Sequence, residues 1–367
     1  MRILHLVAGE KWTGAAAVVF DQTAALVAAG VEAQFGFVRD SPLAERLFPI
    51  GWARPLLSPA RDRLRIFEDV RKMRETVGRE PFDVVHCHSS HDHYVAVAAR
   101  RAGTPLVVRT IHNLRHARGD LLSRMLFRRT DAFAFANREI AEKFGRGGPV
   151  LPPVVDPVRF SPRAEPSERR CALGIPEGSF VVGTVGKLAA GRGHREAIEA
   201  AAAIPSAVLL HVGKGELRPE LESRAAALGA ADRNVWVGYA EAELPELYRA
   251  IDVFLFPASG SEQGQRAILE AMGSGVPVVA VGVPGVADLV TNGREGLVVP
   301  RAEDLAPALR RLRDSPDERK CMAERARERA KEFDGASFAA RAIELYRGIV
   351  ERKSSTSRAW DATETEG

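Results

Sequence analysis

A loop of small residues flanked by two cations stands out in the second half of the sequence. Residues 185–194 read VGKLAAGRGH, with Lys187 and Arg192 on either side of the small residues and a predicted helix directly after them. Backbone N–H groups and the helix dipole favour phosphate at such a position. Two cationic side chains beside it can neutralise a diphosphate without a metal ion. We therefore expect a diphosphate group here, with simple surface exposure of both cations as the alternative.

Two glutamates lie eight residues apart further along the chain. Glu262 stands just before a predicted helix and Glu270 within it, so two helical turns place both on about the same side. Their carboxylates can accept hydrogen bonds from vicinal hydroxyl groups, such as those of a hexose or a ribose. Ile268, Leu269 and Met272 surround Glu270 with apolar residues. This pattern predicts partial burial of Glu270 and not a purely solvent-facing position.

Four histidines and a cysteine crowd into the stretch HCHSSHDH at residues 86–93. His86 and His88 share one face of a predicted strand, which raises the hypothesis of a zinc site. No carboxylate or second thiol cluster with zinc-ligand spacing accompanies them, so we favour a polar strand end that lines a binding site. In this interpretation His88 or His91 contacts an acceptor, and no metal ion is expected.

Apolar runs typical of buried strands alternate with helical stretches in two separate series. The first series predicts strands over 2–8, 31–38, 83–88, 105–110 and 131–136, and the second over 180–186, 207–212, 234–238, 252–257 and 276–281. Such continuous apolar strands are expected where helices cover both faces of a parallel sheet. The sequence therefore predicts an α/β protein with two doubly wound, Rossmann-like domains facing a cleft. Ligands are expected at the carboxyl ends of the strands.

A proline-rich segment separates the two series. Its prolines interrupt any long helix or strand pairing, so we predict a linker over residues 151–178. The linker divides an N-terminal domain over 1–150 from a C-terminal domain over 179–334. We expect the last helical pattern, 335–352, to pack back on the N-terminal domain. The polar residues 353–367 are expected to form a disordered tail.

The composition limits the cellular location. The 367 residues are 46% hydrophobic and 27% charged, with three scattered cysteines, which favours a globular protein in a reducing compartment. The N-terminal apolar run is too short for a signal peptide, and no stretch approaches the roughly 20 apolar residues of a membrane span. We expect a cytoplasmic protein.

Basic residues gather in two helical segments of the N-terminal domain. They are Arg61, Arg63, Arg65, Arg71, Lys72 and Arg74 in one segment, and Arg124, Arg128 and Arg129 in the other. A solvated helix face is the ordinary explanation. The alternative is contact with an anionic surface, either phospholipid at the inner face of the membrane or a phosphorylated glycolipid acceptor. Nucleic acid is not an expected partner, because aromatic residues do not alternate with the basic ones.

The sequence resembles the family-4 retaining glycosyltransferases, which have the GT-B architecture. The similarity runs along most of residues 1–350 and includes the opening with Gly14, the strand at 83–88, the segment from 152 to 160 and the run EAMGSGVPVV at 270–279. The resemblance implies that residues 1–150 form an acceptor-side domain and residues 179–334 a nucleotide-sugar-binding domain. It implies that Lys187 and Arg192 bind the diphosphate of the nucleotide-sugar donor. It also implies that Glu262 contacts the hydroxyls of the donor sugar and Glu270 those of the nucleotide ribose.

The resemblance assigns two residues of the N-terminal domain to the same site. The backbone of Gly14 would approach the donor phosphate, for which glycine is suited because no Cβ blocks the approach. His112, in the sequence Thr-Ile-His-Asn after a strand, matches the active-site histidine of the family near the reacting carbon. The candidate catalytic residues are therefore His112, Glu262, Lys187 and Arg192.

Three departures from the family pattern concern donor recognition and the linker. The family usually has Arg and then Lys where this chain has Lys187 and then Arg192. The two charges are kept, but the guanidinium and ammonium groups, which differ in hydrogen-bonding geometry, exchange places. The usual Glu-Gly-Phe-Gly is replaced by EQGQ, which makes Gln263, Gly264 and Gln265 donor-binding candidates without identifying the sugar. The linker reads PPVVD at 152–156 where PNGVD is frequent.

The predicted function is transfer of a sugar from a nucleotide-diphosphate sugar to an acceptor hydroxyl, with retention of configuration. The acceptor would be a glycan or glycolipid in cell-surface lipopolysaccharide or polysaccharide synthesis. The nucleotide sugar is a substrate, and no cofactor or metal ion is expected. A nucleotide-sugar epimerase of similar architecture and a non-catalytic nucleotide-sugar-binding protein are the alternatives.

Overall fold

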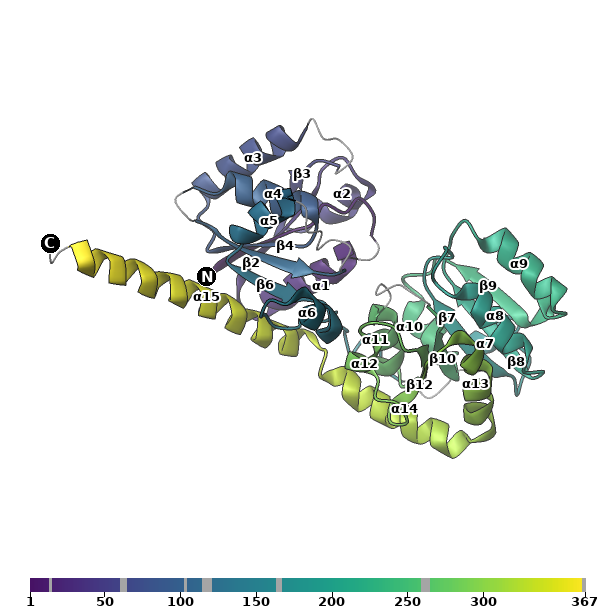
Figure 1. Cartoon of the computed structure of the whole chain (residues 1–367). Helices are drawn as coiled ribbons and strands as arrows, with labels where there is room; N and C mark the ends of the chain where they lie inside the picture. The colour runs from purple at the N-terminus through teal and green to yellow at the C-terminus, as the bar shows by residue number, and fades with distance from the viewer. Residues whose placement is uncertain are drawn as a thin grey trace. The chain divides into compact units, whose positions relative to one another are not determined.

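The computed structural model describes residues 1–12, 15–59, 65–101, 104–113, 121–162, 167–258 and 265–364. The chain divides into two compact units (Figure 1). Unit 1 consists of Met1–Val154 together with Gly335–Gly367, and unit 2 of Val155–Asp334. The second unit is therefore inserted, in sequence, into the first.

Unit 1 is built on a parallel sheet of six strands in the order β3-β2-β1-β4-β5-β6. The strands are β1 (Arg2–Leu6), β2 (Glu32–Val38), β3 (Ala53–Leu57), β4 (Val84–Cys87), β5 (Leu106–Ile111) and β6 (Ala132–Phe135). The helices are α1 (Ala15–Ala28), α2 (Pro42–Leu47), α3 (Ile66–Arg79), α4 (Ser90–Ala99), α5 (Leu121–Arg128), α6 (Arg138–Phe144) and α15 (Gly335–Glu364). Every residue of β4 and β5 is buried, as expected of apolar strands in a covered parallel sheet. The strand order reverses at β1, which lies between β2 and β4.

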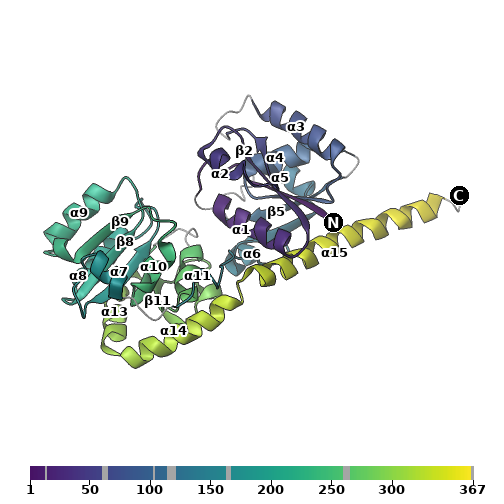
Figure 2. The same ribbon diagram turned by 180° about the vertical axis from the view of Figure 1, so that it is seen from behind.

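Helix α15 lies against unit 1 although it is the last helix of the chain. Its Phe338 and Tyr346 are buried in one hydrophobic cluster with Leu26 of α1 and Ile3 of β1. Figures 1 and 2 show α15 beside α1 from opposite sides. The helix continues to Glu364, where the sequence analysis predicts a disordered tail from residue 353. Residues 353–364 contain neither glycine nor proline, so nothing in them ends a helix that is already formed.

Unit 2 repeats the architecture with a second parallel sheet, in the order β12-β11-β10-β7-β8-β9. Its strands are β7 (Phe180–Val185), β8 (Ala207–Val212), β9 (Asn234–Gly238), β10 (Val253–Phe256), β11 (Val278–Val281) and β12 (Gly296–Val299). Its α-helices are α7 (Ser167–Ala172), α8 (His194–Ala202), α9 (Arg218–Ala227), α10 (Leu244–Arg249), α11 (Gln265–Gly273), α12 (Val286–Leu289), α13 (Leu305–Asp314) and α14 (Pro316–Lys331). The order reverses at β7, which lies between β8 and β10. Two such doubly wound sheets confirm the predicted fold class.

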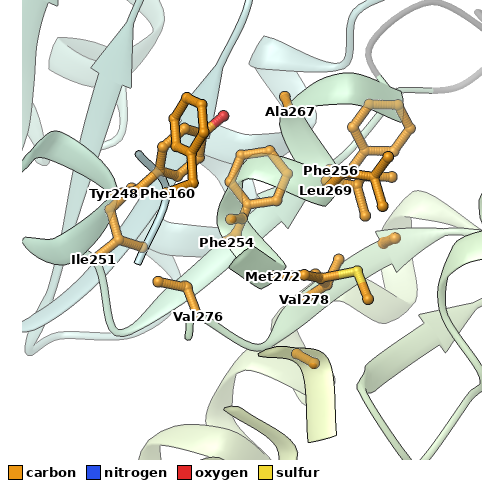
Figure 3. Close-up of a cluster of buried hydrophobic side chains, with 14 of the residues drawn as sticks. Phe160, Tyr248, Ile251, Phe254, Phe256, Ala267, Leu269, Met272, Val276 and Val278 are labelled. Carbon is orange, nitrogen blue, oxygen red and sulfur yellow. The ribbon is translucent and has the colours of Figure 1, made fainter. Parts of the chain in front are cut away.

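A hydrophobic cluster packs α10, α11 and α14 against the sheet of unit 2. Figure 3 shows Phe254 of β10 with Met272 of α11, and the ring of Tyr248 beside Phe160. In α11 every residue except Arg266 is buried. This helix therefore carries its single glutamate, Glu270, into the interior of the unit.

Most of the proline-rich segment lies within unit 2, where the sequence analysis predicts a linker. Val155, Phe160 and Ile175 are buried in the core of the unit. Prolines interrupt regular secondary structure, but the apolar residues between them are still stabilised by leaving water. This explains why an irregular segment is nevertheless a packed part of the domain.

Candidate active site

The loop between β7 and α8 lies where three strands of unit 2 end. A Cβ atom added to Gly193 would collide with the backbone of Pro257, which directly follows β10. On the other side, a Cβ on Gly215 would collide with the backbone of Leu188 in the loop, so the segment after β8 is equally close. Gly193 has a φ of 75°, a left-handed conformation that favours glycine. The carboxyl ends of β7, β8 and β10 thus meet where the strand order reverses, the usual ligand position of such sheets.

The two predicted diphosphate ligands, Lys187 and Arg192, both belong to this loop. Lys187 is exposed, and its Nζ lies 2.9 Å from a carboxylate oxygen of Glu216. Exposed pairs of this kind contribute on the order of 1 kcal/mol or less, so the pair does not hold Lys187 against an incoming phosphate. Arg192 is partly buried, and this burial lowers the pKa of its guanidinium. The buried His194 fixes the loop by a hydrogen bond from its Nε2 to the carbonyl of Lys187, at 3.0 Å.

Glu270 is 4% exposed, as its apolar neighbours predict. Its Oε1 accepts a hydrogen bond from Nε of Arg266 at 2.8 Å, and its Oε2 accepts one from the hydroxyl of Tyr248 at 3.0 Å. Burial raises the pKa of Glu270, and the cation of Arg266 opposes this rise. A carboxylate offers roughly four acceptor positions, so these two bonds leave capacity for ribose hydroxyls. The same contacts also fit a purely structural acid that holds α10 to α11.

The remaining donor-binding candidates surround the start of α11. Gln265 is buried at the first residue of the helix, and its Nε2 donates to the carbonyl of Pro284 at 3.1 Å. Its amide therefore ties α11 to the segment after β11. Gly14, Glu262, Gln263 and Gly264 lie outside the described residues.

In unit 1, His112 lies at the carboxyl end of β5 beside the end of β4. Its Nε2 is 3.1 Å from Nδ1 of His88, the residue that follows β4. His88 is 2% exposed, and burial lowers the pKa of its imidazole well below the ordinary value. His88 is therefore neutral near pH 7, with one ring proton. His112 has a buried, neutral neighbour that can orient its ring.

The histidines of the stretch 86–93 do not form one group. His91 lies with its Nε2 2.9 Å from a carboxylate oxygen of Asp69, and His93 contacts a threonine hydroxyl. His86 and His88 instead meet His5 of β1, and one ring nitrogen of each lies within 4.8 Å of the other two. The register of β1 and β4 brings His5 opposite His86. The three imidazoles that could ligate a metal are therefore a different set from the one in the sequence hypothesis.

The two basic helices of unit 1 differ in how their cations are used. On α3 and just before it, the side chains of Arg65, Arg71, Lys72 and Arg74 all bond to acceptors within unit 1. On and directly after α5, the guanidinium groups of the three arginines have no hydrogen-bond or ion-pair partner among the residues that the structure describes; they are Arg124, Arg128 and Arg129. Three apolar side chains of α5 are also more than half exposed: Leu121, Leu122 and Met125.

None of the described helices combines the length and the apolar character needed to cross a membrane. Arg61 and Arg63 lie outside the described residues.

Comparison with known families agrees with the fold. Residues 12–159 match the model of Glycosyltransferase Family 4, and residues 167–329 match that of Glycosyl transferases group 1. The two matches follow one another along most of the chain and correspond to the two units. The chain belongs to the family-4 glycosyltransferases and has their GT-B fold.

The curated relatives are glycosyltransferases whose names describe different reactions. A 2-deoxystreptamine N-acetyl-D-glucosaminyltransferase of Streptomyces fradiae is 35% identical over 222 residues, or 58% of this chain and 52% of the relative. The lipopolysaccharide core biosynthesis mannosyltransferase LpsB of Rhizobium meliloti is 32% identical over 194 residues, or 50% of this chain and 54% of the relative. The chain spans about half the length of the curated relatives it matches. The crystal structure of Anabaena Alr3699/HepE in complex with UDP and glucose shares the fold, with a TM-score of 0.79 at 22% identity over 94% of this chain and 98% of that one.

The sequence did not predict two residues that contact Glu270, namely Arg266 and Tyr248. Arg266 precedes Glu270 by one helical turn, and this i,i+4 spacing of opposite charges is a signal that could have identified the pair. Tyr248 comes from α10, 22 residues before Glu270. No local pattern connects Tyr248 to the acid, because only the packing of α10 on α11 brings them together.

Proposed function

We propose that the chain transfers a sugar from a nucleotide-diphosphate sugar to an acceptor hydroxyl, with retention of configuration and without a metal ion. The observation that carries the proposal is the loop with Lys187 and Arg192, at the point in unit 2 where the carboxyl ends of β7, β8 and β10 meet. The loop carries two cations and leads into the N-terminus of a helix at the point where the strand order reverses. Such a position suits an anionic, phosphate-bearing ligand. Membership of the family supports sugar transfer as the chemistry, and retention is proposed from the family resemblance.

In the proposed reaction, a bond forms between the acceptor oxygen and the anomeric carbon while the bond from that carbon to the diphosphate breaks. The acceptor proton passes to an oxygen of the departing diphosphate. Negative charge grows on the leaving group, and Lys187 and Arg192 stabilise it more strongly in the transition state than in the ground state. Glu270 and Glu262 hold the ribose and the sugar in place. The family resemblance assigns Gly14 and His112 of unit 1 to the same reaction.

The acceptor that we propose is a glycan or a glycolipid at the cytoplasmic face of the membrane. The support is the segment of α5 and the residue after it, whose three arginines have no ion-pair partner among the described residues and stand beside exposed apolar side chains. Such a helix combines electrostatic attraction to anionic lipid with apolar contact at the headgroups. The basic residues on and before α3 give weaker support, because they are bonded within unit 1.

The test begins with thermal shifts for UDP-, GDP-, ADP- and CMP-sugars, since a ligand that binds the folded chain raises its melting temperature. Release of nucleoside diphosphate is then measured with the stabilising donor and acceptor extracts. Lys187→Ala and Arg192→Ala should each lower kcat by roughly 100-fold or more, the usual cost of removing one charge-stabilising group. Arg195→Ala is the matched control, because Arg195 carries the same charge on α8 but is paired with Glu220 at the surface.

Two outcomes would favour the alternatives. Conversion of the donor to an isomeric sugar without any acceptor would indicate an epimerase. Donor binding without transfer to any acceptor would indicate a non-catalytic binding protein. Near-normal transfer by both loop variants would refute the site itself.

A further inference from the structure

A continuous chain of hydrogen bonds runs through the interior of unit 1 and ends at His112. The residues, in order, are Thr110, His86, Tyr346, His5, His88 and His112; we name this set the histidine chain. The first five members are at most 2% exposed. They come from four elements, namely β5, β4, α15 and β1, and from the residue that follows β4. The mechanism proposed above uses only the last member of this chain.

The distances are those of real hydrogen bonds. His86 lies 2.6 Å from the hydroxyl of Thr110 through its Nε2, and 2.7 Å from the hydroxyl of Tyr346 through its Nδ1. The same tyrosine hydroxyl lies 3.1 Å from Nε2 of His5. His5 continues the chain to His88, with 3.0 Å between its Nδ1 and the Nε2 of His88. All six ring nitrogens of the three buried imidazoles are therefore engaged.

Each buried imidazole of the chain is neutral. Burial lowers the pKa of His5 to about 3, and burial also lowers the pKa of His86 and of His88 well below the ordinary value. A neutral imidazole has one N–H donor and one acceptor nitrogen. If one member of such a chain reverses its donor and acceptor, every neighbour must reverse as well. Tyr346 could accept from both of its histidine neighbours only by leaving its own buried O–H without an acceptor among the described residues; with that O–H used, the chain can point in only two directions.

The end at Thr110 selects one of the two directions. The described residues give the buried hydroxyl of Thr110 a single hydrogen-bond partner, the Nε2 of His86. If Thr110 accepted from His86, its own O–H would be a buried donor without an acceptor, which costs about 1–3 kcal/mol. If Thr110 donates, only lone pairs stay unused, and unused acceptors are tolerated better than orphaned donors. Thr110 therefore donates.

We propose that the histidine chain fixes His112 in the tautomer with the proton on Nδ1, and that Tyr346 and Thr110 are positioning residues that enforce it. Each member donates to the next, so the Nε2 of His112 accepts from His88 and the ring proton of His112 is on Nδ1. The catalytic role that we give to this tautomer rests on the proposed function. In that reaction His112 would give a hydrogen bond to an oxygen of the substrate and would not remove a proton.

A metal ion is the competing explanation for His5, His86 and His88, whose ligand atoms lie within 4.8 Å of one another. The hydrogen-bond inventory favours the chain. A metal ion would have to displace existing bonds at ring nitrogens that already have partners, including those that join Tyr346 to His5 and to His86. The neutral chain needs no added charge in the interior, whereas a dication would place one there at high desolvation cost.

The test is the 15N spectrum of the full chain with its histidine rings labelled, recorded without donor or acceptor. The wild type should show the Nδ1–H tautomer at His5, His86, His88 and His112. Tyr346→Phe removes the linking hydroxyl, so mixed tautomers should appear at His5, His88 and His112. Thr110→Val, which removes the hydroxyl that sets the direction, should also produce mixed tautomers along the chain. Phe338→Leu is the matched control: Phe338 is buried on the same helix outside the chain, and its substitution should leave the tautomers unchanged.

Three results would overturn the inference: an Nε2–H tautomer at His112 in the wild type, an unchanged His112 signal in both Tyr346→Phe and Thr110→Val, or stoichiometric zinc by elemental analysis. With an active donor, Tyr346→Phe should also lower kcat by roughly threefold to tenfold, the weight of one hydrogen bond, while Phe338→Leu should not. If the spectra agree and no transfer occurs, the proposed function fails and the histidine chain stands. If transfer occurs but the tautomers are unchanged in both variants, the proposed function stands and the proposed role of the histidine chain fails.

Discussion

Replacing Arg266 and replacing Glu270, the two members of a buried ion pair, should lower the free energy of unfolding by different amounts. Glu270 is 5% exposed in its side chain and Arg266 is 25% exposed, with 2.8 Å between them. Arg266→Met leaves a buried carboxylate without its cation. Glu270→Gln leaves a cation that already reaches water, and the new amide can still accept from the hydroxyl of Tyr248. The structure thus predicts a larger loss of unfolding free energy for Arg266→Met than for Glu270→Gln.

The magnitudes follow from the burial of each partner. Removing one partner of a fully buried pair costs about 3–5 kcal/mol, and an exposed pair is worth about 0–1 kcal/mol. Arg266 lies between these limits, so we expect about 2–3 kcal/mol for Arg266→Met. Glu270→Gln should cost about 1 kcal/mol, since the bond from the tyrosine hydroxyl is kept and the burial of a charge is relieved. Urea unfolding followed by circular dichroism and fluorescence measures both losses.

The pH dependence gives an independent check of the same reasoning. Burial raises the pKa of Glu270, so the folded state binds its proton more tightly than the unfolded state does. Such a group destabilises the fold as the pH rises through these pKa values and regains stability as the pH falls. Without the opposing cation, the pKa of Glu270 rises further in Arg266→Met. The deficit of this variant relative to wild type should therefore shrink between pH 7.5 and pH 5.5. Equal losses for the two variants, or a deficit that grows at low pH, would refute a buried charge on Glu270.

Three further predictions concern other parts of the chain. Gly193→Ala forces a residue with a side chain into a left-handed conformation against the backbone of Pro257. The free energy of unfolding should fall by about 1–2 kcal/mol or more, and donor affinity should weaken. An unchanged melting temperature and unchanged calorimetric binding of the donor would contradict this prediction. Replacing Arg124, Arg128 and Arg129, on and directly after α5, with glutamine should weaken binding to anionic vesicles by roughly 100-fold, at about 1 kcal/mol for each cation. Equal sedimentation of variant and wild type with such vesicles would exclude this contact. Burial raises the pKa of the Cys87 thiol, whereas Cys171 and Cys321 are exposed, so mass spectrometry should find two thiols alkylated quickly in the folded chain and the third only after unfolding.

The sequence predicts all the interior strands and two of the four edge strands, β6 and β9. The central strands are mostly apolar, as expected of strands that helices cover on both faces. Strands β3 and β12 are both at sheet edges and were not predicted. β3 reads ARPLL, and its Pro55 argues against a strand, although proline is tolerated at an edge, where one side of the strand has no pairing partner. These two edge strands thus depend on tertiary contacts that a local pattern does not contain.

The candidate site shows the same division. The loop with Lys187 and Arg192 could be predicted, because its glycines and cations are close in sequence. The partners of the histidines could not, since Tyr346 lies 260 residues from His86. His5 stands alone in an otherwise apolar strand, and only the register of β1 on β4 places it opposite His86. Contacts of this kind depend on how strands and helices pair, and no spacing rule reaches that far.

The docking of α15 on unit 1 has a consequence for how the chain is synthesised. A ribosome makes the six strands of unit 1 first, yet the helix that covers part of their hydrophobic cluster is made last. Unit 2 is continuous and can fold while the nascent chain is still growing, because domains generally fold as units in the order of their synthesis. Unit 1 must wait with Ile3 and Leu26 partly uncovered until residues beyond 346 emerge. Premature termination before α15 should therefore yield a folded second domain attached to an incomplete first one.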